Sequence, residues 1–189
     1  IPRPDYRLEC GGLGHGTMTG RMLEKIEDIL HVEKPDWVLV YGDTNSTLAG
    51  ALAASKMHIP VAHVEAGLRS FNMAMPEEIN RILTDRVSNY LFCPTDTAVK
   101  NLRTEGFPFD SSSGDEQKIL NVGDVMYDAT LFYQKKAKET VSLEKWGLVE
   151  NGYALCTIHR AENTDDPNRL QSIIKALTTI NKSLPIILP

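Results

Sequence analysis

Apolar runs of strand length alternate with segments of helical period along most of the chain. The run Asp36–Tyr41 has the length and composition of a strand, and the Ala- and Leu-rich Asn45–Met57 is typical of a helix. Further strands are predicted at 60–64, 90–93, 119–122, 153–158 and 185–188, and further helices at 96–105, from about 125, and at 169–182. This alternation predicts an α/β fold with a doubly wound parallel sheet and helices on both faces.

One predicted helix has a charged face opposite an apolar stripe. It begins at Pro76, with Glu77 and Glu78 in its first turn, where the helix dipole favours acids. A step of 100° per residue predicts a buried stripe and places Glu77, Arg81 and Thr84 on the opposite face. The predicted stripe consists of Ile79, Ile82, Leu83, the stem of Arg86, Val87 and Tyr90. The charged face is either a solvated i, i+4 ion pair or the lining of a cleft.

A polar segment at 110–118 interrupts the alternation and is the best candidate for a linker. It predicts one domain over residues 1–118 and a second over 119–189. The chain opens at Ile1 without Met and closes on an apolar run, Pro185–Pro189, which predicts an internal fragment of a longer protein.

Composition narrows the function classes. Lys and Arg number 20 against 25 Asp and Glu, a formal net charge of −5 with no basic block, so nucleic-acid binding is not expected. The apolar runs are too short for a membrane span. The three cysteines form no CxxC pair, which argues against a disulfide framework and against structural zinc. The cytosol is the expected location.

Polar residues just past predicted strands are the candidates for chemistry, because ligands of open parallel sheets gather at the carboxyl ends of strands. Asp43 follows the first strand, although a helix cap explains such a residue equally well. His63 and Glu65 share one side of the next strand; His63 fits a buried core group, whereas a carboxylate at the strand's mouth needs a partner. His159 and Arg160 follow a later strand and suit an anion.

Two other site types lack their required context. A glycine spacing similar to that of a dinucleotide-binding loop occurs at Gly14, Gly16 and Gly20. The segment before these glycines is not a buried strand, so no nicotinamide site is predicted. The residues His63, Glu65, His159 and Asp43 could ligate zinc, yet no spacing of the HxxxH type fixes two ligands on one element. No metal and no cofactor are therefore expected.

Five segments together resemble the non-hydrolysing UDP-N-acetylglucosamine 2-epimerases. They are Tyr41–Thr44, His63–Arg69, Met75–Arg81, Asn121–Asp124 and Thr157–Asn163, in the family's order. The resemblance implies two Rossmann-like domains of glycosyltransferase-B type, with a UDP-sugar bound in the cleft between them. It also implies a homodimer when the protein is complete, and it implies that an Arg near the first strand, the Gly-rich diphosphate loop and the uridine pocket lie outside this chain.

The family's functional residues can be carried over by position. Its aspartate falls on Asp43, its two glutamates on Glu65 and Glu77, and its substrate-contacting histidine on His159. Arg81 and Arg160 are added here as candidate partners of the diphosphate. The loop 70–75 resembles versions in relatives that act on various UDP-N-acetyl sugars, uronic acid derivatives included, so the same reaction on more than one sugar is compatible with it.

The chemistry explains why such residues are needed. The C2 proton of a UDP-N-acetylhexosamine becomes acidic only as UDP leaves C1, and its loss gives a glycal to which proton and UDP return. Carboxylates would move the proton and stabilise positive charge, and cations would bind the leaving diphosphate. Which carboxylate is the base stays open. The alternatives are a hydrolysing epimerase, a glycosyltransferase of the same fold and a non-catalytic UDP-sugar sensor.

Overall fold

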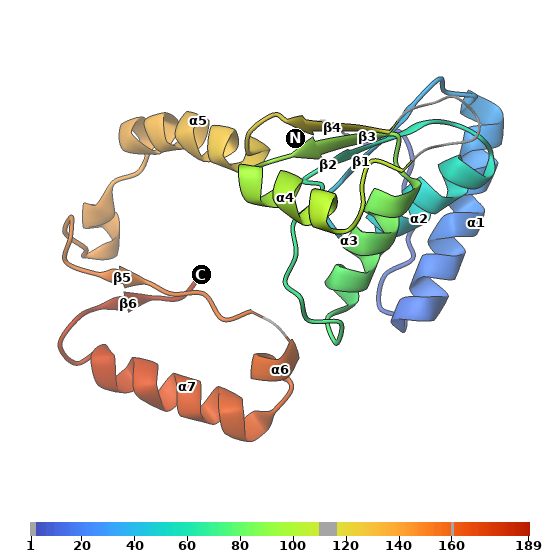
Figure 1. Ribbon diagram of the computed structural model, residues 1–189. Coiled ribbons are helices and arrows are strands. Elements are labelled where there is room, and N and C mark those ends of the chain that lie inside the picture. The colour runs from blue at the N-terminus through green and yellow to red at the C-terminus, as the bar shows by residue number, and fades with distance from the viewer. Residues whose placement is uncertain (1–2, 110–116, 160) are drawn as a thin grey trace. The chain divides into compact units, whose positions relative to one another are not determined.

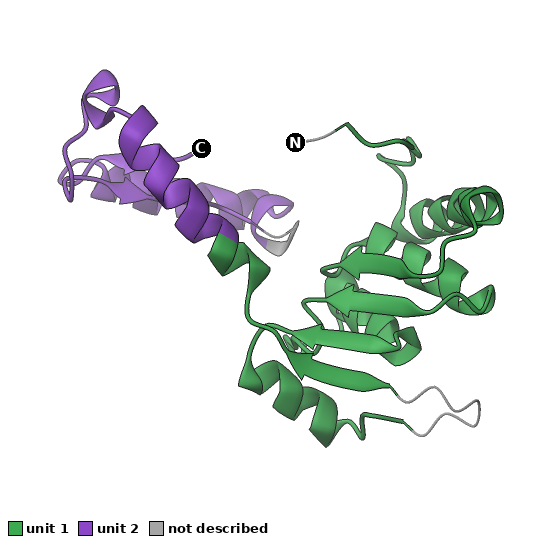
Figure 2. Cartoon of the chain, turned by 90° about the horizontal axis from the view of Figure 1, so that it is seen from above, with its two compact units in different colours: residues 1–128 green, residues 129–189 purple. Residues whose placement is uncertain are grey.

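The computed structural model describes residues 3–109, 117–159 and 161–189, which form two compact units. Figure 2 colours them separately: unit 1 is residues 1–128 and unit 2 is residues 129–189. The predicted linker at 110–118 falls mostly outside the described residues. Lys118 and the residues up to Asn121 pair with β3 in the first sheet, and the two units divide after Asp128.

Unit 1 is built on a parallel sheet in the order β1-β2-β3-β4 (Figure 1). The strands are β1 (Val38–Tyr41), β2 (Val61–Val64), β3 (Tyr90–Cys93) and β4 (Lys118–Asn121). Val40 pairs in register with His63, His63 with Leu91, and Leu91 with Ile119. The helices are α1 (His15–Glu33), α2 (Asn45–Lys56), α3 (Pro76–Val87) and α4 (Asp96–Thr104). The α/β class and the parallel sheet predicted from the sequence are confirmed.

The helices α1 to α4 lie on one face of this sheet (Figure 1). A sequential strand order with right-handed crossovers puts every connection on the same side, and only a reversal of that order would fill the other side. The prediction of helices on both faces is therefore wrong for the described part of unit 1. The opposite face shows a shallow groove lined by Trp37, Leu39, Ala62, Tyr90 and Phe92.

Two apolar clusters fill the covered face. One joins Leu30 of α1 and Ala51, Ala53 and Ala54 of α2 to Val40 and Val61. The other joins Ala98 and Leu102 of α4 to Ala66, Leu91, Cys93 and Phe107. The burial of these groups fixes the sheet, and with it the carboxyl ends of the strands. Cys10 and Cys93 are buried free thiols, and Cys156 is a partly exposed one.

Unit 2 holds the remaining elements, and its strands are shorter than those of unit 1. The remaining elements are α5 (Val125–Thr140), whose first turn belongs to unit 1, the 3₁₀ turn Leu143–Trp146, β5 (Ala154–Leu155), α6 (Ala161–Thr164), α7 (Pro167–Ile180) and β6 (Ile186–Ile187). β5 and β6 pair in parallel, and the Asp166 side chain caps α7 through the amides of Asn168 and Arg169. The 3₁₀ turn and α6 were not predicted. Among the described residues, no helix is long and apolar enough to cross a membrane.

Candidate functional site

Among the carboxyl groups that follow the carboxyl ends of strands in unit 1, three interact with one another through Glu65. Asp43 comes two residues after β1, Glu65 directly after β2, and Asp124 three residues after β4. The Asp124 carboxylate also caps α5, accepting from the Met126 amide at 2.8 Å. Parallel strands end at one edge of a sheet, so these acids share the position at which such sheets bind ligands.

Glu65 has the most unusual surroundings of the three. Its backbone is left-handed, with φ of +72°, a conformation that costs a non-glycine residue free energy and tends to occur at functional sites. Gly42 lies beside this carboxylate: a Cβ added there would be in ordinary contact with Glu65 Oε2, at 3.5 Å, so it is the left-handed φ of +67° that favours glycine at this position. Burial raises the pKa of Glu65 above its ordinary value, and Asp124 and Asp43 add to the rise, whereas His63 and Arg81 oppose it.

The segment that carries Glu65 is anchored to the buried Asp85 carboxylate. Asp85 Oδ2 accepts from the Gly67 amide at 3.1 Å and from Arg69 Nη1 at 2.7 Å. Gly67 (φ +77°) also passes so close to α4 that an added Cβ would lie 2.5 Å from the Ala98 carbonyl oxygen. A side chain at residue 67 would therefore displace Glu65 or α4.

Asp43 is held by two residues of α3. Arg81 Nη2 forms an ion pair with Asp43 Oδ2, and Asn80 Nδ2 donates to the Asp43 carbonyl at 2.9 Å. The cap of α2 is Thr44, whose hydroxyl and that of Thr47 form a capping box. Since Thr44 supplies the cap, the Asp43 side chain is available to Arg81 and to the site edge.

Glu78 connects α3 to the loop that follows Glu65. Its carboxylate is buried and accepts from the amides of Ser70 (3.1 and 3.0 Å) and Phe71 (2.9 Å). It also pairs with Arg81 Nη1, so a chain of charges runs from the loop through Glu78 and Arg81 to Asp43. Burial alone would raise the pKa of Glu78. The Ser70 and Phe71 amides and Arg81 lower this pKa by more than burial raises it, so the net pKa is below the ordinary value.

The face that α3 buries is polar, which overturns the stripe predicted for it. Its buried residues are Glu78, Asn80, Thr84 and Asp85, whereas Ile79 is 40% and Leu83 46% exposed. The physical reason is that the loop 65–71 and the turn after β1 offer amides, carbonyls and charged groups, and polar side chains satisfy them. Arg81 pairs with Glu78 and Asp43, so the solvated ion pair with Glu77 is replaced by a partly buried one.

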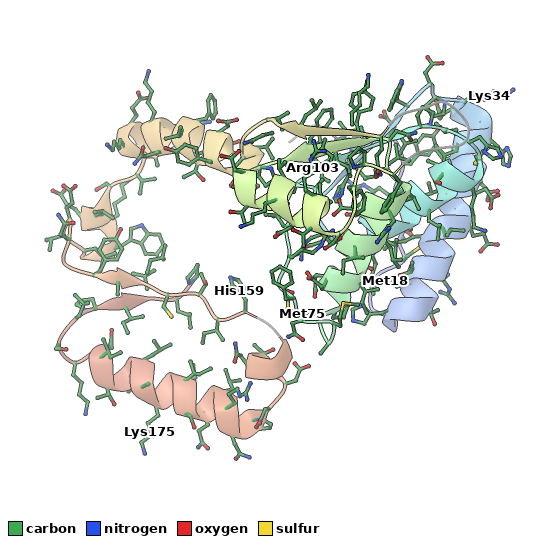
Figure 3. The ribbon with its side chains drawn as sticks, in the orientation of Figure 1. Met18, Lys34, Met75, Arg103, His159 and Lys175 are labelled. Carbon is green, nitrogen blue, oxygen red and sulfur yellow. The ribbon has the colours of Figure 1, made fainter. Side chains whose placement is uncertain are left out.

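The structure brings some of the predicted site residues together and leaves others apart. Asp43, Glu65 and Arg81 come together, while Glu77 is exposed at the start of α3. His63 is fully buried, as a core histidine would be. His159 is exposed in unit 2, beyond β5, and its carbonyl accepts from Asn163 Nδ2 at 2.9 Å (Figure 3). Arg160 lies outside the described residues.

Sequence reasoning missed four residues that build this site: Glu78, Asn80, Asp85 and Asp124. The signal for Glu78 and Asn80 was their place in the Met75–Arg81 segment, and Asp124 stands in another of the recognised segments. Nothing local marks Asp85. Across the described residues, no group of His, Cys, Asp and Glu has the arrangement of a metal site. The absence of a metal and of a cofactor stays a prediction.

Comparisons with known proteins identify the family. A family model described as UDP-N-acetylglucosamine 2-epimerase matches residues 1–189. The chain is 59% identical over 190 residues to the UDP-2,3-diacetamido-2,3-dideoxy-D-glucuronate 2-epimerase of Pseudomonas aeruginosa, covering 100% of this chain and 51% of that protein. It is 49% identical over 183 residues to the UDP-N-acetylglucosamine 2-epimerase of Methanocaldococcus jannaschii, covering 95% and 48%.

Solved structures give the same picture. The Methanocaldococcus jannaschii UDP-GlcNAc 2-epimerase in complex with UDP-GlcNAc and UDP matches with a TM-score of 0.86 at 47% identity, over 100% of this chain and 51% of that one. The Neisseria meningitidis UDP-GlcNAc 2-epimerase bound to UDP-GlcNAc matches with a TM-score of 0.77 at 31% identity, over 95% and 49%. The chain thus spans about half the length of the curated relatives it matches.

Proposed function

Because the chain belongs to the UDP-N-acetylglucosamine 2-epimerase family, we propose that the full-length protein inverts C2 of a UDP-N-acetylhexosamine. The reaction converts UDP-N-acetylglucosamine to UDP-N-acetylmannosamine. The observation that carries the proposal is the meeting of Asp43, Glu65 and Asp124 at the strand ends, with Arg81 among them. An acidic edge of this kind suits a sugar that develops positive charge.

The steps balance without a redox partner. The bond between C1 and the diphosphate oxygen breaks, UDP leaves with the electron pair, and a base takes the C2 proton, which leaves a C1–C2 double bond. Return of a proton to the other face of C2 and of UDP to C1 completes the inversion. The carboxylates supply proton transfer and charge stabilisation, and both are stronger in the transition state than in the ground state.

The surroundings of each carboxylate favour a division of roles. Glu65, whose pKa is raised, is the better group to take and return a proton near neutral pH. Asp43, paired with Arg81, is suited to remain ionised beside C1 and stabilise positive charge. Arg81 is engaged by two carboxylates, so we assign it to holding Asp43. Glu77 remains a further candidate acid, and His159 and Arg160 remain candidates for the diphosphate.

The identity of the sugar is the finer part of the proposal. One relative is named for UDP-2,3-diacetamido-2,3-dideoxy-D-glucuronate and another for UDP-N-acetylglucosamine. The 59% identity to the first makes the diacetamido-glucuronate the second candidate substrate. Both sugars carry an acetamido group at C2 and a UDP at C1, and the same elimination serves either.

The test is to incubate the full-length protein with each UDP-sugar in deuterated water and follow C2 by NMR. Deuterium at C2 together with the epimeric UDP-sugar is expected from one of the two. Stoichiometric free sugar and UDP would indicate a hydrolysing epimerase. An unchanged C2 hydrogen would refute the proposal and leave a transferase or a sensor. Activity that survives exhaustive EDTA treatment would agree with the absence of a metal.

Variants test the roles. Asp43→Asn, Glu65→Gln and Glu77→Gln should chiefly lower kcat, each by roughly 10²- to 10⁴-fold, because each keeps shape but loses charge and proton affinity. His159→Ala should also raise KM, since a donor to the diphosphate acts on substrate and leaving group alike. Glu27→Gln, on the exposed side of α1, is the control. If a carboxylate variant turns over like the parent, its assignment is wrong.

A further inference from the structure

His63 lies between the turn after β1 and the Asp85 carboxylate, and both of its ring nitrogens face hydrogen-bond acceptors. Nε2 is 2.7 Å from the Gly42 carbonyl oxygen, and Nδ1 is 2.7 Å from Asp85 Oδ1. The side chain is fully buried, so water does not compete for either nitrogen. A neutral imidazole carries one N–H and would leave one of these short contacts without a hydrogen, whereas an imidazolium donates to both.

The other partners of Asp85 indicate that it is ionised. Its second oxygen accepts from the Gly67 amide and from the Arg69 guanidinium, which disfavours a proton on the carboxyl group. Arg69 in turn makes a two-pronged pair with Glu105, at 2.7 and 2.9 Å. Burial raises the pKa of the neighbouring Cys93 thiol to about 12, and Asp85 adds to the rise, so that thiol contributes no charge.

Charge counting favours the same protonation state. With His63 protonated, the network holds two cations, His63 and Arg69, and two anions, Asp85 and Glu105. With His63 neutral, the largely buried network would carry an uncompensated negative charge, and an unpaired buried charge is costly.

The position of His63 ties this network to the site. Gly42, whose carbonyl accepts from His63, directly precedes Asp43, and Glu65 stands two residues beyond His63. The buried Asp85 carboxylate thus supports both strand ends: it holds the turn after β1 through His63 and the segment after β2 through Gly67 and Arg69.

We propose that His63 is a positioning residue that stays an imidazolium and fastens the Gly42–Asp43 turn to the buried Asp85 carboxylate. The catalytic consequence of this proposal rests on the proposed function, whereas the protonation state of His63 does not depend on it. The positive charge also acts on Glu65, which is faced by Asp43, His63, Arg81 and Asp124; His63 and Arg81 favour its ionised form against the two acids.

Neutron diffraction from deuterium-exchanged crystals of the full-length protein at pH 8 tests the protonation state directly. Deuterium on both Nδ1 and Nε2 of His63 is the expected result. Deuterium on one nitrogen alone overturns the proposal. The readout needs neither a variant nor activity, so it remains informative even if neither UDP-sugar proves to be a substrate.

The positioning role is tested by the pH dependence of kcat and KM in His63→Gln, a neutral variant. Loss of the charge should move the acidic limb of the profile to higher pH and lower kcat more than it changes KM. His31→Gln, at an exposed position of α1, should leave the profile where it is. A loss that is equal at every pH would reduce His63 to a packing role and overturn the proposal. If the variant does not fold, the neutron result decides.

Discussion

The helices α2 and α3 connect neighbouring strands on one face of the sheet, yet they bury opposite kinds of side chain. α2 buries Ala49, Ala51, Ala53 and Ala54, among others. α3 buries Glu78, Asn80, Thr84 and Asp85. The alanines let α2 approach the sheet closely through contacts that have no preferred direction. Glu78, Asn80 and Asp85 of α3 bond with partners in other segments, so α3 is placed by directional contacts and places the site in turn.

The difference between the buried side chains of α2 and those of α3 gives the two helices different roles: α2 stabilises the fold, and α3 also positions the site. Burying a carboxylate costs several kcal/mol unless it is paired, so the charges on α3 are tolerated only because Arg81, Arg69, His63 and loop amides satisfy them. Of these partners, Arg69 and the loop amides belong to the segment after β2, whereas His63 in β2 and Arg81 on α3 bond to the turn after β1. A substitution in α2 should therefore change stability alone, while one in α3 should change stability and geometry together.

Removal of the Asp85 carboxylate should cause the largest loss of stability among the variants of the two helices. Asp85→Ala leaves His63 and Arg69 without their shared anion, and loss of one partner of a buried charge pair costs about 3–5 kcal/mol. The measurement is urea unfolding of the full-length protein. Asp85→Asn, which keeps an acceptor for Gly67, should cost less. A loss below about 1 kcal/mol for the alanine variant would mean that the network is not structural.

A larger side chain in α2 should have a smaller and simpler effect. Ala54 is fully buried, and Ala54→Leu should cost about 1–3 kcal/mol through overpacking. The cost should be the same at pH 5 and pH 8, because no charged group is involved. Unfolding curves at the two pH values provide the check, and a pH-dependent cost would contradict the contrast between the helices.

Glu78→Gln should show the pH dependence that α2 lacks. The pKa of Glu78 is lowered in the folded state, so its stabilisation is complete above its ordinary value of 4.5 and is lost as pH falls through the lower folded value. The parent should exceed the variant by about 1–2 kcal/mol at pH 7. Unfolding measured down to acidic pH should show this gap closing below about pH 4.5; a constant gap would exclude an ionic role.

Glu27→Gln should set the baseline for both helices. Glu27 lies on the exposed side of α1, and surface substitutions of this kind change stability by no more than about 0.5 kcal/mol. The same unfolding measurement applies. A larger change would show that net charge, rather than specific pairing, contributes to the other effects.

Periodicity and short motifs predicted most of the fold. The four strands of unit 1 and its helices α2, α3 and α4 lie within a few residues of their predicted positions, whereas α1 had no predicted range; the family suggested by five short segments is confirmed by the family model. Local signals suffice here because apolar period, caps such as Thr44 and the Pro76 start are encoded within a few neighbouring residues. Strand order is not local, which is why the covered face was mispredicted.

The site was predictable only in part for a related reason. Asp43 and Glu65 stand at strand ends, where topology alone marks them, but Arg81 could be paired with Asp43 only through the fold. The apolar stripe of α3 pointed to the wrong face, because the groups that satisfy Asp85, and those other than Arg81 that satisfy Glu78, come from residues 7 to 22 positions earlier in the chain. The burial of a charged side chain cannot be predicted from its neighbours in the sequence when its partners come from other segments.

The segment from Gly67 to Phe71 has no regular secondary structure, but three of its amides donate to carboxylates. Gly67 donates to Asp85, and Ser70 and Phe71 donate to Glu78, both carboxylates being almost fully buried. Hydrogen exchange reports the opening that an amide needs before it meets water, and these amides open only when a buried charge loses its partners. They should exchange as slowly as strand amides of the sheet, so this loop belongs to the rigid part of the molecule.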